Sequence, residues 1–243
     1  MAKVHHTFIT GETSLVEEYC LLCAGKRMPV TVRLLPGNKS RLPKEVSRSS
    51  AVPKSTTLAL ELTNTSPDVK KKNLALLDRS LPSSIPIISS SVTITVAEQT
   101  GWVKHPERLI GIGALPSLLE GSLIEFAASS LTNEQTKTIA YSFASSLGKE
   151  AATVRDSVGL VMPRILCMLT NEAYFAMMEG VANGSDIDTA MKLGTNYPLG
   201  PVERGQRIGL VHVHAVLSAL WKQFGEDRYR IAPMLQQAVF MSR

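Results

Sequence analysis

The stretch DSVGLVMPRILCMLTNEAYFAMMEGVANGSDIDTAMKLGTNYPLGPVERGQRIGL, residues 156–210, decides the fold of this chain. Apolar residues recur in its first half at helical spacing, which predicts one packed helix. The predicted buried face consists of Ile165, Met168, Leu169, Ala173, Met177 and Val181. Ser185 with Asp188 forms a capping box that predicts a second helix, and Gly194 predicts its end. Further apolar helical patterns over 208–224 and 232–241 make this part all-helical.

Upstream of this stretch, patterns typical of strands and of helices alternate. The segments that favour strands are 4–10, 29–34, 56–63, 86–88, 92–96, 109–112 and 123–128. Helices are expected over 15–24, over 67–80 after the cap Ser66, and from a Thr132/Gln135 capping box to Gly148, and a loop is expected over 36–55. The sequence therefore predicts an α/β domain with a mostly parallel sheet over 1–155 and an all-α domain over 156–243.

The 156–210 stretch also carries several motifs in a fixed order. They are a D-x-x-G turn, an Arg-led helix with N-E-A, a D-I-D cap, and a Y-P-x-G-P loop leading to I-G-L. The residues in register are Asp156, Gly159, Arg164, Asn171, Glu172, Ala173, Asp186, Asp188, Gly194, Tyr197, Pro198, Gly200, Pro201, Ile208, Gly209 and Leu210. The stretch closely resembles the C-terminal domain of 3-hydroxyacyl-CoA dehydrogenases, and the match continues upstream, more loosely toward the start. The resemblance implies a reduced Rossmann-like NAD-binding domain followed by a helical dimerisation domain.

The same resemblance implies which positions would carry the reaction. Oxidation of a 3-hydroxyacyl thioester needs a base for the hydroxyl proton while hydride passes to nicotinamide, and the family uses a His held by a Glu. Gly113 occupies the His position, and Glu125 occupies the Glu position twelve residues on. Ser90 matches a family Ser at the reacting centre, whereas Pro163 replaces a family Asn. Glycine has no proton-accepting side chain, so the general base is predicted to be absent.

The dinucleotide site is expected to be equally eroded. Such a site uses a G-x-G-x-x-G turn, which lets backbone approach the pyrophosphate at a helix N-terminus, and an acid that binds the ribose. The matching run, residues 9–14, keeps only Gly11, places Glu12 beside the phosphates and ends on Ser14. Arg33 stands near the position of the ribose acid, and Glu61 matches a family glutamate near the cofactor. NAD binding is expected to be weak or absent, with an Arg33 contact to a 2′-phosphate as the alternative.

Composition and charge argue against several other classes of protein and of binding site. With 243 residues and 44% hydrophobic residues, the chain can bury a substantial core, and without an apolar run of about 18 residues no membrane span is expected. A cytoplasmic location is the default expectation.

Three cysteines do not form a disulfide framework, and Cys20 and Cys23 are interpreted as core residues of a helix, with no metal bound. The net charge of +5 gathers over 39–54, where a solvated loop is favoured over a nucleic-acid site.

Three histidines outside the family motifs are interpreted as non-catalytic. His105 lies in a polar turn and is taken as a surface residue. His212 and His214 are two apart on a predicted helix, so their side chains point to different faces and do not share a metal. They are interpreted as helix-surface or interface residues.

Three functional hypotheses remain open. The leading one is a 3-hydroxyacyl-CoA dehydrogenase-like protein with little or no dehydrogenase activity. It would hold an acyl-CoA or nucleotide, or pair through its helical half with a second copy or a homologue. The second is a working NAD-dependent dehydrogenase of fatty-acid metabolism that uses Ser90 and Glu125 with a substitute base. The third is nucleic-acid binding through 39–54.

Overall fold

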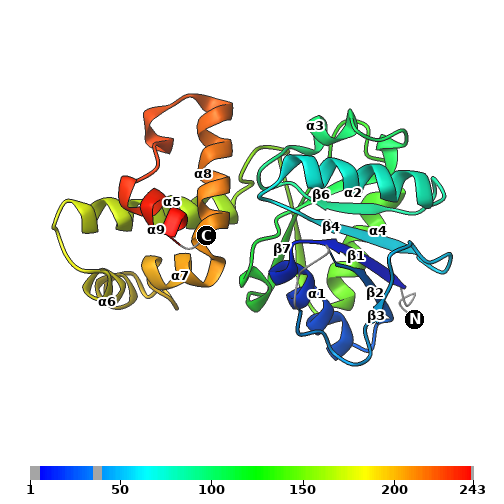
Figure 1. The fold of residues 1–243 in the computed structure, drawn as a ribbon, viewed down its shortest axis with the longest axis horizontal. Helices are drawn as coiled ribbons and strands as arrows, with labels where there is room; N and C mark the ends of the chain where they lie inside the picture. The colour runs from blue at the N-terminus through cyan, green and yellow to red at the C-terminus, as the bar shows by residue number, and fades with distance from the viewer. Residues whose placement is uncertain (1–5, 35–39, 242–243) are drawn as a thin grey trace.

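The computed structural model describes residues 6–34 and 40–241. Figure 1 shows two parts side by side: a sheet flanked by helices, and a purely helical part that follows it in the chain. The predicted order, an α/β domain and then an all-helical domain, is confirmed. The exact boundary at residue 155 stays a prediction.

The described strands form one sheet in the order β3-β2-β1-β4-β5-β6-β7-β8. Their bounds are β1 Thr7–Gly11, β2 Val30–Arg33, β3 Ser47–Arg48, β4 Leu58–Leu62, β5 Ile87–Ser90, β6 Leu109–Ile112, β7 Leu123–Ala127 and β8 Glu150–Val154. Neighbouring strands are parallel except β6 and β7. Strands β1, β4, β5 and β6 are buried along their whole length, as expected for apolar runs covered on both faces.

Helices cover both faces of this sheet. α1 (Thr13–Gly25) and α4 (Glu134–Ser146) pack with Ile9 and other strand residues into one core. α2 (Pro67–Ser80) and α3 (Val96–Thr100) pack with Phe8 into the core on the opposite face. Phe8 and Ile9 join different cores because successive strand side chains point to opposite faces. Short 3-10 turns at Pro106–Arg108 and Leu118–Glu120 complete this part.

The helical part contains five α-helices among the described residues. They are α5 Met162–Met178, α6 Gly184–Thr195, α7 Pro201–Ile208, α8 Leu210–Phe224 and α9 Pro233–Met241, with a 3-10 turn at Asp227–Tyr229. Their core also takes in Val92 and Leu115, which follow β5 and β6. The two parts are therefore packed together at the carboxyl ends of these strands. Within the described ranges, no helix is long and apolar enough to cross a membrane.

Two predicted helix caps are wrong by one or two residues. Asn133 caps α4 by accepting the Thr136 N–H at 2.7 Å, while the predicted cap Thr132 donates to the Leu109 carbonyl. Asn183, not Ser185, caps α6. Short polar residues compete for the same cap, and the sequence pattern does not rank them.

Strand predictions also need correction. The predicted strand over 92–96 is wrong, because Thr95 caps α3 there by accepting the Glu98 N–H. The expected loop over 36–55 contains the edge strand β3, and β8 was not predicted. The basic residues described in that loop, Arg41, Lys44, Arg48 and Lys54, are exposed, while Lys39 lies outside the described residues.

The buried face of α5 differs from the predicted stripe. The buried residues are Pro163, Cys167, Thr170, Asn171, Ala173 and Tyr174. Of the predicted stripe, Ile165 is 49% exposed and Val181, just beyond the helix, is 72% exposed. Burial of two polar residues is possible because Thr170 donates to the Pro201 carbonyl and Asn171 bonds backbone at 230 and 232. As a result, part of the apolar stripe faces outward.

Candidate functional site

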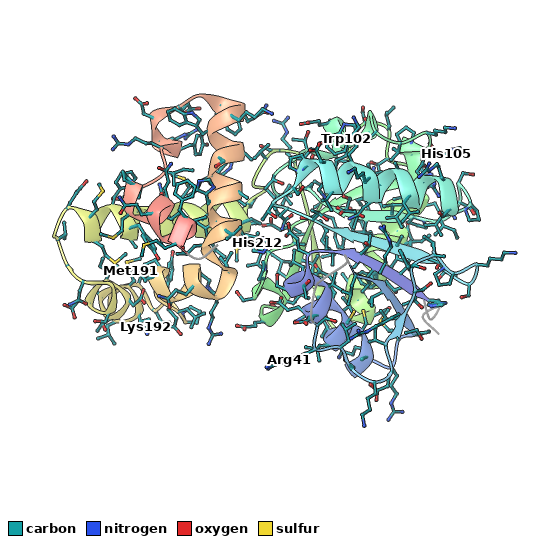
Figure 2. The ribbon with its side chains drawn as sticks, in the orientation of Figure 1. Arg41, Trp102, His105, Met191, Lys192 and His212 are labelled. Atoms are coloured by element: carbon teal, nitrogen blue, oxygen red, sulfur yellow. The ribbon has the colours of Figure 1, made fainter. Side chains whose placement is uncertain are left out.

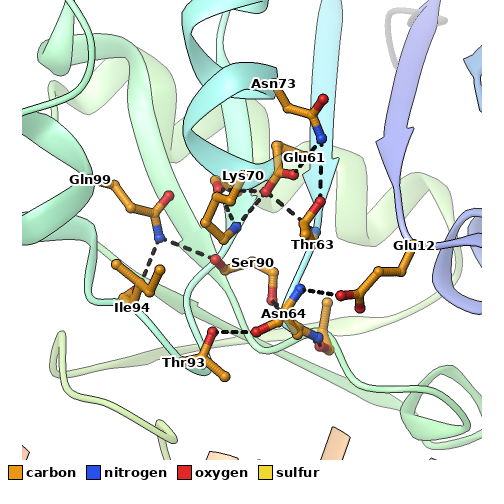
Figure 3. A network of polar contacts seen from close by, with 12 residues as sticks. Glu12, Glu61, Thr63, Asn64, Lys70, Asn73, Ser90, Thr93, Ile94 and Gln99 are labelled. Atoms are coloured by element: carbon orange, nitrogen blue, oxygen red, sulfur yellow. Dashed lines mark hydrogen bonds and ion pairs between the residues drawn. The ribbon is translucent and has the colours of Figure 1, made fainter. Parts of the chain in front are cut away.

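The carboxyl ends of β1, β4 and β5 meet at one edge of the sheet. Here the chain order reverses, because β1 lies between β2 on one side and β4 on the other. In open parallel sheets, ligands bind in the crevice outside the strand ends at such a switch point. Glu12, Asn64 and Ser90 lie at this crevice (Figure 3).

Ser90, predicted to be catalytic, is fully buried below the crevice. Its hydroxyl donates to Asn64 Oδ1 at 2.6 Å, and Asn64 Nδ2 donates to the Ala114 carbonyl at 2.8 Å. Thr93 Oγ1 donates to the Asn64 carbonyl at 3.0 Å. Asn64 therefore ties the loops after β4, β5 and β6 together (Figure 3). The Ser90 hydroxyl is used in this network and has no exposed surface.

The structure brings Gly113 and Glu125 together. Gly113 directly follows β6, and its N–H donates to the Glu125 carbonyl oxygen in β7 at 2.9 Å. A Cβ at residue 113 would lie 3.4 Å from Glu125 Oε2 and 3.3 Å from Leu160 Cδ1. A side chain at 113 would thus stand directly beside the carboxylate. In this chain Leu160 packs over the position instead.

The Glu125 carboxylate is bound by the start of α5. Its oxygens accept the N–H groups of Val161 at 3.1 Å and Met162 at 2.9 Å, which have no partner within the helix. Pro163 follows in the first turn, where its missing N–H costs no hydrogen bond. Glu125 is therefore a helix cap here, and Pro163 presents no amide side chain.

The turn between β1 and α1 keeps one feature of a dinucleotide fingerprint. Gly11 has a φ of +144°, and a Cβ there would lie 2.5 Å from the Leu62 carbonyl carbon. Only glycine fits so close to β4. Ser14, the last residue of the fingerprint run, is exposed in the first turn of α1.

Glu12 extends its carboxylate across the crevice to the loop after β4. Oε1 accepts the Asn64 N–H at 3.0 Å, the Thr65 N–H at 2.6 Å and the Thr65 hydroxyl at 2.6 Å. It makes no side-chain cap on α1, although Glu12 holds the N-cap position. A protein carboxylate thus lies where the fold places a ligand's phosphates.

His212 is a site residue whose role the sequence did not reveal. It lies in the first turn of α8, and its Nδ1 atom is 3.5 Å from Glu12 Oε2, so this buried side chain contacts the sheet part of the same chain. Burial lowers the pKa of His212 below its usual 6.5, against the opposing pull of Glu12. Residues 12 and 212 share no local pattern, so only the packing of the two parts could place them together.

Arg33 and Glu61 belong to a buried polar cluster beside the crevice. Arg33 Nη1 donates to Asn73 Oδ1 at 3.2 Å, and Asn73 Nδ2 donates to Glu61 Oε1 at 3.1 Å. Lys70 forms an ion pair with Glu61 and donates to Ser89 Oγ at 3.1 Å (Figure 3). Glu61 and Lys70 are almost completely buried. Arg33 and Glu61, both predicted as cofactor-binding positions, therefore have protein partners.

The arrangement does not fit a dinucleotide bound in the manner of this fold. The pyrophosphate would lie beside the Glu12 carboxylate, and two anions repel each other strongly in a partly buried site. At the end of β2, Arg33 stands where a carboxylate would bind the ribose hydroxyls.

A pocket of about 460 Å³ lies between the two parts, next to this crevice. Asn64, Thr65 and Thr93 line it from the sheet part, and α8 lines it with His214, Ser218 and Lys222. These three α8 residues are four apart, so they share one helix face. Figure 2 shows His212 at the junction between the parts. The pocket has both apolar walls and converging polar groups, as ligand sites do.

The surroundings of the two cysteines in α1 and of His105 differ from those of a catalytic or metal site. Cys20 and Cys23 are buried in α1, and burial raises the pKa of each to about 12, as for inert core thiols. Among the described residues, no group of three His, Cys, Asp or Glu side chains could hold a metal ion. The His105 side chain is 44% exposed and faces Glu107, as expected for a surface residue.

Comparison with known proteins agrees with this architecture. Residues 159–243 match the family model described as 3-hydroxyacyl-CoA dehydrogenase, C-terminal domain. The chain is 28% identical over 240 residues to 3-hydroxybutyryl-CoA dehydrogenase of Clostridioides difficile, covering 97% of this chain and 85% of that protein. It is 31% identical over 170 residues to a probable 3-hydroxybutyryl-CoA dehydrogenase of Bacillus subtilis, covering 70% of this chain and 59% of that protein.

A solved structure shows the same fold over nearly the whole chain. It is (S)-3-hydroxybutyryl-CoA dehydrogenase of Ralstonia eutropha, with a TM-score of 0.80 and 24% identity, covering 98% of this chain and 94% of that one. The sheet part, the helical part and the order of their motifs thus agree with one group of proteins. The chain belongs to the 3-hydroxyacyl-CoA dehydrogenase family.

Proposed function

We propose that this protein binds an acyl-CoA-type ligand between its two parts without oxidising it through the family's general base. The observation that carries the proposal is the pairing of Gly113 with Glu125. Glu125 is in place to orient a base, but residue 113 has no side chain to be oriented. Loss of a general base typically lowers a rate by about 10²- to 10⁴-fold.

The surroundings of Glu125 support this proposal. Both carboxylate oxygens receive backbone N–H groups from the start of α5, and Leu160 covers the side facing residue 113. Both oxygens of Glu125 are thus engaged as helix caps by backbone N–H groups. Glu125 itself is therefore not the substitute base.

The pocket beside α8 supports an acyl-thioester ligand. Val158, Val211 and Ala215 offer apolar contact, and Lys222 supplies a cation at the same wall. An acyl chain would contact the apolar residues, while an anionic group of the ligand would pair with the ammonium group. The curated relatives carry CoA thioesters in their names, which is consistent with this class.

A spectrophotometric assay tests the proposal. NADH and acetoacetyl-CoA are mixed with the wild-type chain and with a Ser90→Ala, Glu125→Ala double variant, and absorbance of NADH is followed. We expect the two rates to be equal and at background, while calorimetry without nucleotide detects acetoacetyl-CoA binding. A wild-type rate clearly above that of the double variant, or no thioester binding, contradicts the proposal.

An active NAD-dependent 3-hydroxyacyl-CoA dehydrogenase is the second candidate. The specific observation in its favour is the similarity to proteins named as 3-hydroxybutyryl-CoA dehydrogenases, along almost the whole chain in one case. Ser90 and Glu125 are also retained. This candidate requires a base other than residue 113, and the same assay decides it.

We also propose that the helical half pairs with a second copy of this chain or with a homologue. Large apolar side chains are exposed there, including Ile165 on α5, Leu193 at 82% on α6, and Phe240 at 62% on α9. Exposed large apolar side chains are typical of a protein interface when they gather into a patch. A C2 dimer would bury the same residues from both copies.

A further inference from the structure

Two buried polar atoms face each other across the junction of the two parts. Glu12 Oε2 and His212 Nδ1 are both buried, have no hydrogen-bond partner within residues 6–34 and 40–241, and are 3.5 Å apart. The side chains are 17% and 11% exposed, respectively. Unsatisfied buried polar atoms are uncommon in folded proteins and call for an explanation.

The other oxygen of Glu12 is bound as a ligand anion would be. Two backbone N–H groups and one hydroxyl, all from Asn64 and Thr65, converge on Oε1. Backbone N–H groups that converge on one oxygen are a common way to bind phosphate. Here the oxygen belongs to the protein itself.

The backbone fixes Glu12 in this position. Its N–H donates to the Leu62 carbonyl at 3.0 Å, and the preceding Gly11 packs directly against Leu62. The turn is thus held against the end of β4, from where the side chain reaches the 64–65 loop. α8 then covers the carboxylate with His212.

We propose that Glu12 is a tethered anion that occupies the phosphate position of the crevice, excludes dinucleotides, and joins the helical part through His212. Glu12 is then the residue that determines cofactor specificity. The contact between the two parts is made here by protein side chains. This inference rests on the proposed function, because it names the residue that would set the ligand class of the same crevice.

Nucleotide affinity tests the inference directly. Binding of NAD⁺, ADP-ribose and inorganic pyrophosphate is measured by calorimetry for the wild type, Glu12→Ala and Glu12→Gln. Glu134→Ala is the matched control, since it removes one negative charge from an exposed position on α4. We expect both Glu12 variants to bind NAD⁺ at least about tenfold more tightly than the wild type and the control. Equal affinities, including no binding by any of them, overturn the inference.

A second variant and a second measurement distinguish the predicted effect from misfolding. Glu12→Gln has the size of the native side chain, so it remains measurable if Glu12→Ala does not fold. Hydrogen exchange provides the second measurement: His212→Ala should speed exchange of the Asn64 and Thr65 N–H groups, and unchanged exchange contradicts the link between the parts. Thioester binding without gain of NAD⁺ affinity would reject the inference alone, whereas turnover by the wild type would reject the proposed function.

Discussion

Gly113, directly after β6, and Glu125 on β7 are joined by one backbone hydrogen bond of 2.9 Å between the Gly113 N–H and the Glu125 carbonyl oxygen. A side chain at residue 113 would therefore stand beside the Glu125 carboxylate, and glycine supplies none. The need for a base can be tested separately from the need for its positioning residue by placing a side chain at residue 113. Gly113 is not one of the glycines with a positive φ, so its backbone accepts other residues.

An imidazole at residue 113 should raise the rate of acetoacetyl-CoA reduction only when the Glu12 carboxylate is also removed from the crevice. We expect Gly113→His alone to leave acetoacetyl-CoA reduction at background, because Glu12 still occupies the phosphate position. The Gly113→His, Glu12→Ala variant should exceed Gly113→Ala, Glu12→Ala by on the order of 10²-fold, the usual contribution of a general base. Steady-state NADH oxidation measures both. Equal rates in the two double variants would show that Glu125 does not orient an imidazole at 113.

The His212 imidazole should make the stability of the protein depend on pH. Its pKa is lower in the folded chain than the usual 6.5, so the unfolded chain takes up the proton first as the pH falls. The full free energy of unfolding is present above pH 6.5 and decreases as the pH falls below that value. Urea denaturation at pH 7.5 and at pH 5.5 should show this decrease in the wild type and a smaller one in His212→Gln. His105→Gln, at an exposed site, should behave as the wild type does.

Asp78 and Arg108 form a buried ion pair that we expect to be important for stability. Arg108 Nη2 donates to Asp78 Oδ1 at 2.8 Å, and Arg108 Nη1 donates to the Leu81 carbonyl at 3.2 Å. Asp78→Ala would leave the guanidinium buried and unpaired, which should lower the free energy of unfolding by about 3–5 kcal/mol. Asp227→Ala, at an exposed turn, should change it by less than about 0.5 kcal/mol. A loss below about 1 kcal/mol for Asp78→Ala would mean that water compensates the charge.

The same pair should be sensitive to acid. Burial alone opposes ionisation of Asp78, but hydrogen bonds from Arg108 and the Lys104 N–H outweigh it and hold its pKa below the usual 3.8. Its contribution to stability is thus full above pH 3.8 and is lost as the pH falls through the lower, folded value. Acid denaturation of Asp78→Asn should therefore lack this part of the transition. An unchanged acid midpoint and slope would contradict the assignment.

The exposed apolar residues of the helical half should control self-association. An Ile165→Glu, Leu193→Glu variant is expected to be monomeric in sedimentation velocity at concentrations where the wild type is dimeric, because a charge buried in an interface is costly. Leu131→Glu is the matched control, since Leu131 is 53% exposed on the sheet part. Dissociation by the control alone, or a wild type that is monomeric at all concentrations, would exclude this surface.

Much of the fold could be predicted because it depends on local patterns. Apolar runs of strand length and helical repeats placed β1, β4, β6, β7 and α2 close to their observed bounds. Local sequence patterns did not predict the structure correctly where neighbouring residues compete for the same cap or the same buried face. Asn133 and Thr132 could both cap α4, and an α5 sequence that is apolar nearly all round does not show which face will be buried.

By itself, the sequence determined the two-part architecture and the absence of a proton-accepting side chain at residue 113, since both follow from residue types and their spacing. Only the tertiary structure decided that Glu12 bonds to the 64–65 loop and meets His212, and that the Ser90 hydroxyl is used within the core. These contacts join residues far apart in the chain. They depend on how the helical part packs against the strand ends, which no periodicity along the chain encodes.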